Sequence, residues 1–137
     1  MLNKNKLFIQ KLRSSGLRPT RQRVEISKFL FSRKKTFHFT VDDLNKLINS
    51  KRNKKISLAT LYNTVHALKS AGHLQEFSLE NNTSYYDTNI KSNHHFFDNG
   101  KVIDIKSDKI TFHKLPDAPK GKKIKNVEVV IRLENNN

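Results

Sequence analysis

Six histidines are the side chains with the clearest capacity for chemistry, in a chain of 137 residues that contains no cysteine. The missing thiols exclude disulfides, thiolate zinc sites and cysteine nucleophiles. Two histidines are adjacent, which is less ordinary than a lone solvated histidine. On a strand, adjacent side chains point to opposite faces, so one metal ion takes both only if the backbone bends. The six are His38, His66, His73, His94, His95 and His113.

A second set of chemically capable residues shares one face of a predicted helix, Leu58–Ala71. Its apolar positions form a stripe that leaves the opposite face exposed. Base edges in the major groove are read by hydrogen bonds and methyl contacts. Tyr62 could pack on thymine methyl groups and Asn63 could bond adenine. The alternative is a half-buried Tyr62 and a solvated Asn63. The stripe comprises Leu58, Leu61, Val65 and Leu68, and the exposed face Ala59, Thr60, Tyr62, Asn63 and His66.

Four amphipathic helices are predicted to position these residues. Thr20 and Ser57 are suitable N-caps, Thr40 with Asp43 three residues later forms a capping-box pattern, and Gly72 suits a C-terminal end. In the third helix, Leu44, Leu47 and Ile48 are predicted to face inward. The predicted ranges are Lys4–Ser15, Arg21–Ser32, Val41–Ser50 and Leu58–Ala71.

After the last helix the pattern changes to that of strands. Leu74–Leu79 and Thr83–Asp87 flank the turn Glu80-Asn81-Asn82, which predicts a β-hairpin. Three helices, a short turn, a fourth helix and a hairpin follow the order of a winged helix-turn-helix. This pattern predicts a DNA-binding domain over residues 1–88.

The polar segment 89–93 is predicted to be a hinge, and residues 94–137 to form a second domain. Strands are predicted at His94–Phe97, at Lys101–Ile105 and within Lys125–Leu133. This half has too few apolar residues to bury a core alone, so pairing with a second copy is expected. The fold class is therefore α+β, a winged helix followed by a small α/β dimerisation domain.

The charge indicates a polyanionic partner. The chain has 27 Lys+Arg against 12 Asp+Glu, a formal net charge of +15, of which residues 1–88 carry +11 and residues 89–137 carry +4. Nucleic acid is expected before a membrane surface. No apolar run suits a transmembrane helix or a signal peptide, so a cytoplasmic location is expected. No catalytic motif is found, and an enzyme is not expected.

Taken in order along the chain, several motifs resemble the ferric uptake regulator family. The most specific is Ile56-Ser57-Leu58-Ala59-Thr60-Leu61-Tyr62. Others are Gly16–Arg23, His38–Leu44, His94-His95 and Gly100–Asp104. Within the family, Tyr62-Asn63-Thr64, the tail from Leu115 to Leu133 and the missing cysteines look like the iron response regulator branch, which tends to lack the family's structural Cys-x-x-Cys pairs.

The resemblance implies roles in binding an operator. It places Arg18 in a minor groove, where narrow A-tract grooves attract arginine. Arg21 and Arg23, with Lys51, Arg52, Lys54 and Lys55, would contact phosphates, which position without specifying sequence. Thr60, Tyr62 and Asn63 would lie at the bases. Asn63 replaces the family's usual arginine, which implies a different operator.

For sensing, the resemblance implies a metal site built from His38, Asp87, Asp104 and one histidine of the adjacent pair, with His95 as the candidate and His94 as the open alternative. Its nitrogen and oxygen donors suit Fe(II), Mn(II) or Zn(II). Because the ligands come from both domains, occupancy would couple to DNA-binding geometry. The branch instead implies haem, with His94 and His95 as candidate ligands, since an imidazole can hold haem iron axially.

These observations predict a homodimeric transcriptional regulator of iron or haem homeostasis that binds a double-stranded operator and responds to haem or a divalent metal. Two alternatives stay open. One is a basic nucleic-acid-binding protein without a sensor. The other is a regulator of the same family that responds to zinc, manganese or peroxide.

Overall fold

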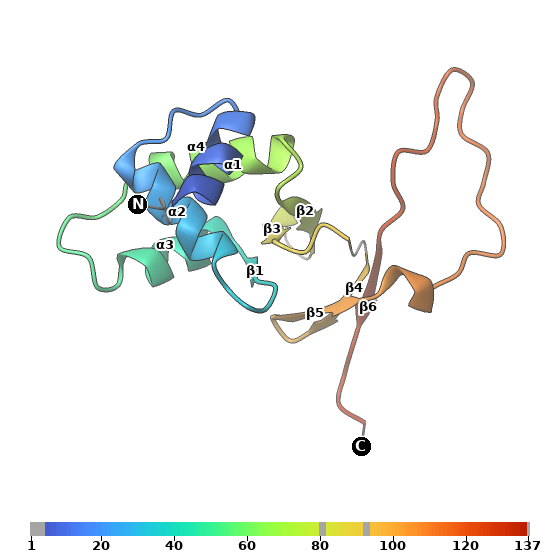
Figure 1. Cartoon of the computed structure of the whole chain (residues 1–137). Helices are drawn as coiled ribbons and strands as arrows, with labels where there is room; N and C mark the ends of the chain where they lie inside the picture. Colours follow the sequence, from blue (N-terminus) through green and yellow to red (C-terminus); the bar gives the residue numbers. More distant parts are fainter. Residues whose placement is uncertain (1–4, 80–81, 92–93, 137) are drawn as a thin grey trace. The chain divides into compact units, whose positions relative to one another are not determined.

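The chain divides into two compact units, Met1–Ile90 and Lys91–Asn137. A computed structural model describes residues 5–79, 82–91 and 94–136 (Figure 1). Residues 80 and 81 of the predicted hairpin turn and residues 92 and 93 of the predicted hinge lie outside this described part.

The first unit contains the four predicted helices, α1 (Lys6–Ser14), α2 (Arg21–Phe31), α3 (Val41–Asn49) and α4 (Leu58–Ser70). The predicted N-caps are confirmed. Thr20 accepts a hydrogen bond from the Arg23 N–H, Ser57 accepts one from the Thr60 N–H, and Thr40 forms a capping box with Asp43. Each cap satisfies a backbone N–H that lacks a partner in the first turn and stabilises its helix by about 1 kcal/mol. Within the described residues, no helix has the length and apolar character needed to cross a bilayer.

Apolar side chains from α2, α3 and α4 form one buried core together with Phe39 and Tyr86. Two core predictions are wrong, because Leu47 and Leu58 are 49% and 44% exposed. Leu58 is the first residue of α4, where no preceding turn covers it. The buried face of α4 instead includes Thr64, whose hydroxyl donates to the Thr60 carbonyl at 2.7 Å. In α3, Asn49 is buried in addition to the apolar residues.

A three-stranded antiparallel sheet completes the first unit, in the order β1-β3-β2. The hairpin strands β2 (Gln75–Ser78) and β3 (Ser84–Asp87) lie within the predicted segments. β1 (His38–Phe39) pairs with the far edge of β3 and was not predicted, because two residues are too few for an alternating pattern. Helices followed by this hairpin make the unit a winged helix.

The second unit is a three-stranded sheet in the order β5-β4-β6. β4 (His94–Asp98) is antiparallel to β5 (Lys101–Ile105) and parallel to β6 (Val129–Arg132). The turn between β4 and β5 places Asn99 and Gly100 at positive φ, as a tight hairpin requires. A single 3₁₀ turn, η2 (Ser107–Lys109), is the helical element among the described residues of this unit. β6 lies within the segment Lys125–Leu133 in which the third strand is predicted.

Candidate functional site

The first pair of potential ligands lies on the sheet of the first unit. His38 in β1 and Asp87 in β3 are directly opposite in the antiparallel register. Their Nε2 and Oδ2 atoms are 3.1 Å apart, with the Asp87 side chain fully buried and that of His38 17% exposed. The other carboxylate oxygen, Oδ1, accepts a hydrogen bond from the Asn89 N–H at 2.8 Å. Asp87 is thereby oriented with Oδ2 toward the imidazole.

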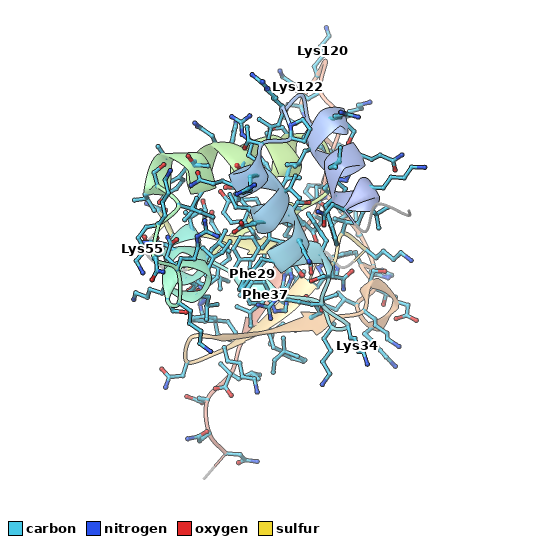
Figure 2. The ribbon with its side chains drawn as sticks, turned by 60° about the vertical axis from the view of Figure 1, so that its left-hand side comes forward. Phe29, Lys34, Phe37, Lys55, Lys120 and Lys122 are labelled. Carbon is cyan, nitrogen blue, oxygen red and sulfur yellow. The ribbon has the colours of Figure 1, made fainter. Side chains whose placement is uncertain are left out.

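Two hydrogen bonds between Phe37 and Thr88, called the Phe37–Thr88 tie below, lie just outside the strand ladder and help to position His38. The Phe37 N–H donates to Thr88 Oγ1 at 2.9 Å, and the Thr88 N–H donates to the Phe37 carbonyl at 3.1 Å. The Phe37 ring stacks on Phe39 and meets Phe29 edge-on, with centroids 5.2 and 6.3 Å away (Figure 2). These contacts hold the two-residue strand β1 in register. Sequence reasoning missed Thr88, because its partner lies 51 positions away.

The second pair is built in the same way on the sheet of the second unit. His95 in β4 and Asp104 in β5 are opposite each other in the antiparallel register. His95 Nε2 lies 3.1 Å from Asp104 Oδ1, and the two side chains are 2% and 18% exposed. Each unit therefore holds one imidazole against one carboxylate across neighbouring strands.

His94 has a different role from His95. Its Nδ1 accepts a hydrogen bond from the Val129 N–H at 3.0 Å, and its ring packs edge-on against Phe112. An acceptor nitrogen carries the lone pair, so in the neutral ring the proton lies on Nε2. His94 is 4% exposed and ties β4 to β6. The two adjacent histidines have separate partners and are not brought together at one site.

The candidate base-reading face lies on α4. Tyr62 is 50% exposed, and Asn63 is also exposed. Thr60 is half-buried, and its hydroxyl lies 2.8 Å from the Ser57 hydroxyl at the N-cap. Tyr62 and Asn63 therefore present side chains outward, whereas Thr60 belongs to the helix cap.

A polar hollow of about 350 Å³ lies beside Tyr62. Tyr86 lines it from β3, and its hydroxyl donates to Glu76 Oε2 at 3.2 Å. Burial, together with the negative charge of Glu76, raises the pKa of Tyr86 to about 12. Tyr86 therefore remains a neutral hydroxyl at physiological pH. Threonine, serine and asparagine side chains make up most of the remaining lining: Thr40, Val41, Asp42, Tyr62, Asn82, Thr83 and Ser84.

A buried amide fixes the turn before α4. Asn49 is 8% exposed; its Nδ2 donates to the Ile56 carbonyl at 3.0 Å, and its Oδ1 accepts from the Ile56 N–H at 2.8 Å. Ile56 immediately precedes the N-cap Ser57, so this two-point bond sets where α4 begins. Sequence reasoning missed Asn49, although an asparagine at a helix end followed by a polar loop is a weak signal for such a bond.

The predicted phosphate-contacting arginines differ in their surroundings. Arg18 and Arg21 are exposed, whereas Arg23 is half-buried and donates through Nη1 to the Arg18 carbonyl at 3.0 Å. Arg23 thereby holds the connection before α2, and its remaining donors can still meet a phosphate.

Two further cations predicted as phosphate contacts are engaged within the unit. Arg52 forms an ion pair with Glu25, and Lys55 donates to the Asn49 carbonyl. Both brace the loop between α3 and α4. Both side chains therefore have partners within the unit, whether or not they also contact phosphate.

The chain is similar to known proteins in sequence and in fold. A family model described as the ferric uptake regulator family matches residues 14–132. The peroxide-responsive repressor PerR of Staphylococcus epidermidis is 32% identical over 99 residues, which are 71% of this chain and 64% of that protein. The ferric uptake regulation protein of Synechococcus elongatus is 34% identical over 104 residues, which are 72% of this chain and 69% of that protein.

Solved structures share the fold. The ferric uptake regulator of Pseudomonas aeruginosa with manganese superposes with a TM-score of 0.68 at 18% identity, covering 96% of this chain and 99% of that one. A zinc-bound manganese uptake regulator superposes with a TM-score of 0.63 at 21% identity, covering 93% of this chain and 97% of that one.

Proposed function

The chain belongs to the ferric uptake regulator family, and we propose that it is a transcriptional regulator whose DNA binding depends on a divalent metal ion. The observation that carries the proposal is the repeated construction of an imidazole against a carboxylate with one member of each pair buried, Asp87 in the winged-helix unit and His95 in the second unit. The names of the relatives, a peroxide-responsive repressor and a ferric uptake regulation protein, support a regulatory role.

The proposed metal site takes both ligand pairs. His38 and Asp87 supply one nitrogen and one oxygen, and His95 and Asp104 supply the same from the second unit. Two imidazoles and two carboxylates fit Fe(II), Mn(II) or Zn(II), and the chain offers no thiolate to favour a structural zinc. Within each pair the donor atoms already converge, so the metal would replace the hydrogen-bonding proton between them.

Such a site would couple metal binding to DNA binding. An ion with two ligands on each unit favours those arrangements of the units in which all four donors meet. If that arrangement suits the operator, metal and DNA each raise affinity for the other by the same factor. To this coupling the protein contributes two rigidly held His–Asp pairs, one on each unit.

For the DNA interface, we propose that Tyr62 and Asn63 read bases, with Thr60 closing the helix cap beside them. Arg18 enters a minor groove, and Arg21 and Arg23 contact phosphates. The exposed face of α4 supports this arrangement.

A homodimer on a palindromic operator is proposed. The second unit leaves large apolar side chains 37–48% exposed, which a second copy would cover. They are Ile103, Phe112, Leu115, Ile124, Ile131 and Leu133.

A haem response of the iron response regulator type is the second candidate. Tyr62-Asn63-Thr64 and the absence of cysteine favour it. The hydrogen bond to His94 Nδ1 weighs against His94 as a ligand through Nε2, since that nitrogen then carries the proton. His95 would have to leave Asp104 to bind haem iron.

The test is duplex binding measured with a palindromic site selected from random DNA. Fe(II), Mn(II), Zn(II) and haemin are titrated separately, and hydrogen peroxide is added to the Fe(II) form. A divalent metal is expected to raise affinity in the wild type and in His113→Ala, which removes an exposed histidine outside both pairs. His38→Ala and His95→Ala should abolish the response. Sequence-independent binding that no metal or haemin alters would contradict the proposal.

A further inference from the structure

The net charge of the second unit is concentrated in one segment. Residues 114–125 contain five lysines and one aspartate, so this segment has a formal charge of +4. In the rest of residues 91–137 the five basic and five acidic side chains cancel. The net positive charge of the unit is therefore confined to this segment and is not spread over its whole surface. The segment, called the basic segment below, has its cations at Lys114, Lys120, Lys122, Lys123 and Lys125.

The basic segment has a defined shape without belonging to a helix or strand. The Lys122 N–H donates to the Pro119 carbonyl at 2.9 Å, and Gly121 has a φ of +79°, the pattern of a β-turn with glycine at its third position. Pro116 and Pro119 restrict the chain leading into this turn. Figure 2 shows Lys120 pointing away from the ribbon at the turn in the middle of the segment.

The cations of the basic segment are not neutralised within the unit. Among the described residues, none of its five lysines has an ion-pair partner. All five are exposed, as is every residue from 114 to 125 except the half-buried Ala118. Like charges this close in sequence repel one another, and a polyanion removes that repulsion while releasing its own counterions.

We propose that the basic segment binds the phosphate backbone of duplex DNA beyond the bases read by α4. The inference rests on the proposed DNA-binding function and adds a second contact surface to it. The two large apolar side chains of the segment, Leu115 and Ile124, belong to the apolar set proposed above for the dimer contact, and between them, apart from two prolines, no side chain is both apolar and larger than alanine. Recognition is therefore electrostatic, and lysine ammonium groups contact phosphates as point charges without reading sequence.

The experiment measures duplex affinity against salt concentration for the full chain with Mn(II) bound. Lys120→Gln/Lys122→Gln/Lys123→Gln is compared with Lys101→Gln/Lys106→Gln/Lys109→Gln, which removes the same charge from exposed positions of the same unit outside the segment. Each phosphate contact contributes about 0.9 to the slope of log affinity against log salt, so the first variant should lose up to about 2.7 for each segment engaged. The control should keep the wild-type slope.

Shortening the duplex on both sides of the operator gives a second readout. The wild type should lose affinity as flanking phosphates are removed, whereas the segment variant should lose little. Equal slopes for the two triple variants would overturn the inference while leaving the proposed function intact. Failure of the wild type to bind any duplex would overturn both. Loss of binding to phosphatidylserine vesicles with an unchanged DNA slope would assign the segment to membranes instead.

Discussion

The two units hold the same pair of side chains, a histidine against an aspartate, by different means. In the first, His38 lies on a two-residue strand that is held by Thr88, by the aromatic side chains around Phe37 and by a deep helical core. In the second, His95 lies on one of two five-residue strands, whose antiparallel register places it opposite Asp104. An equivalent donor geometry therefore arises either from a long regular ladder or from a very short one with side-chain ties.

The largest effect is expected from breaking the two pairs separately. His38→Ala and His95→Ala should each lower Mn(II) affinity by more than about 100-fold, the upper range for losing only an outer-shell partner of a ligand. If the pairs share one ion, calorimetry gives one Mn(II) per chain, and the double variant is hardly worse than either single one.

Two ions per chain, with each single variant retaining one tight site, would show that the units bind metal independently. His113→Ala is the matched control, because this exposed histidine belongs to neither pair.

Asn49→Ala is expected to have the next largest effect, confined to the first unit. It leaves the Ile56 N–H and carbonyl without their partner in a buried position, which costs about 1–3 kcal/mol of unfolding free energy. Denaturant unfolding checks this value, and hydrogen exchange should show lost protection at the start of α4 with unchanged β4 and β5. Asn53→Ala, on an exposed residue of the same loop, should stay within about 0.5 kcal/mol of wild type.

A smaller effect is expected at the hydrogen bond between Phe37 and Thr88 beside the first pair. Thr88→Val keeps the shape but removes the acceptor for the Phe37 N–H, so β1 should hold His38 less accurately. Mn(II) affinity should fall by about 10-fold, the lower range for an outer-shell partner. Thr88→Ser restores the hydroxyl and should recover most of the affinity. If both variants bind Mn(II) equally, the tie does not position His38.

The smallest effect is expected for the pH dependence of stability, through the hydrogen bond between His73 and Ser14 in the first unit. His73 Nε2 lies 2.7 Å from the Ser14 hydroxyl, and burial, followed by the charge of Lys11, lowers the pKa of His73 from its usual 6.5. A lowered folded-state pKa means that protonation opposes folding. The contribution of neutral His73 to the free energy of unfolding is therefore complete above pH 6.5, and it is lost as the pH falls from 6.5 through the folded-state pKa.

His73→Gln should flatten the fall in stability below pH 6.5 in thermal unfolding, whereas His113→Gln should not. An unchanged pH profile in His73→Gln would remove this histidine as a source of the dependence.

Local chemistry predicted much of the first unit. Thr20, the Thr40–Asp43 capping box and Ser57 correctly marked the first residues of α2, α3 and α4, because capping is a contact between near neighbours in sequence. The inward direction of Leu47 and Leu58 was wrong, since burial at helix ends depends on what the neighbouring elements cover.

Sequence by itself determined the helices, the hairpin, the exposed α4 face and the concentration of charge, because each depends on residues close together in the chain. Tertiary structure alone decided that β1 exists, that Asn49 holds Ile56 and that His94 bonds Val129. It also set the register in which His95 meets Asp104, two residues that the family resemblance had assigned to one site. The Asn49–Ile56 bond joins near neighbours. The other contacts join residues that are between 9 positions apart, as in the pair His95–Asp104, and 49 positions apart, as in the pair His38–Asp87. No local pattern encodes such pairings, since their free energy comes from the packing of whole elements.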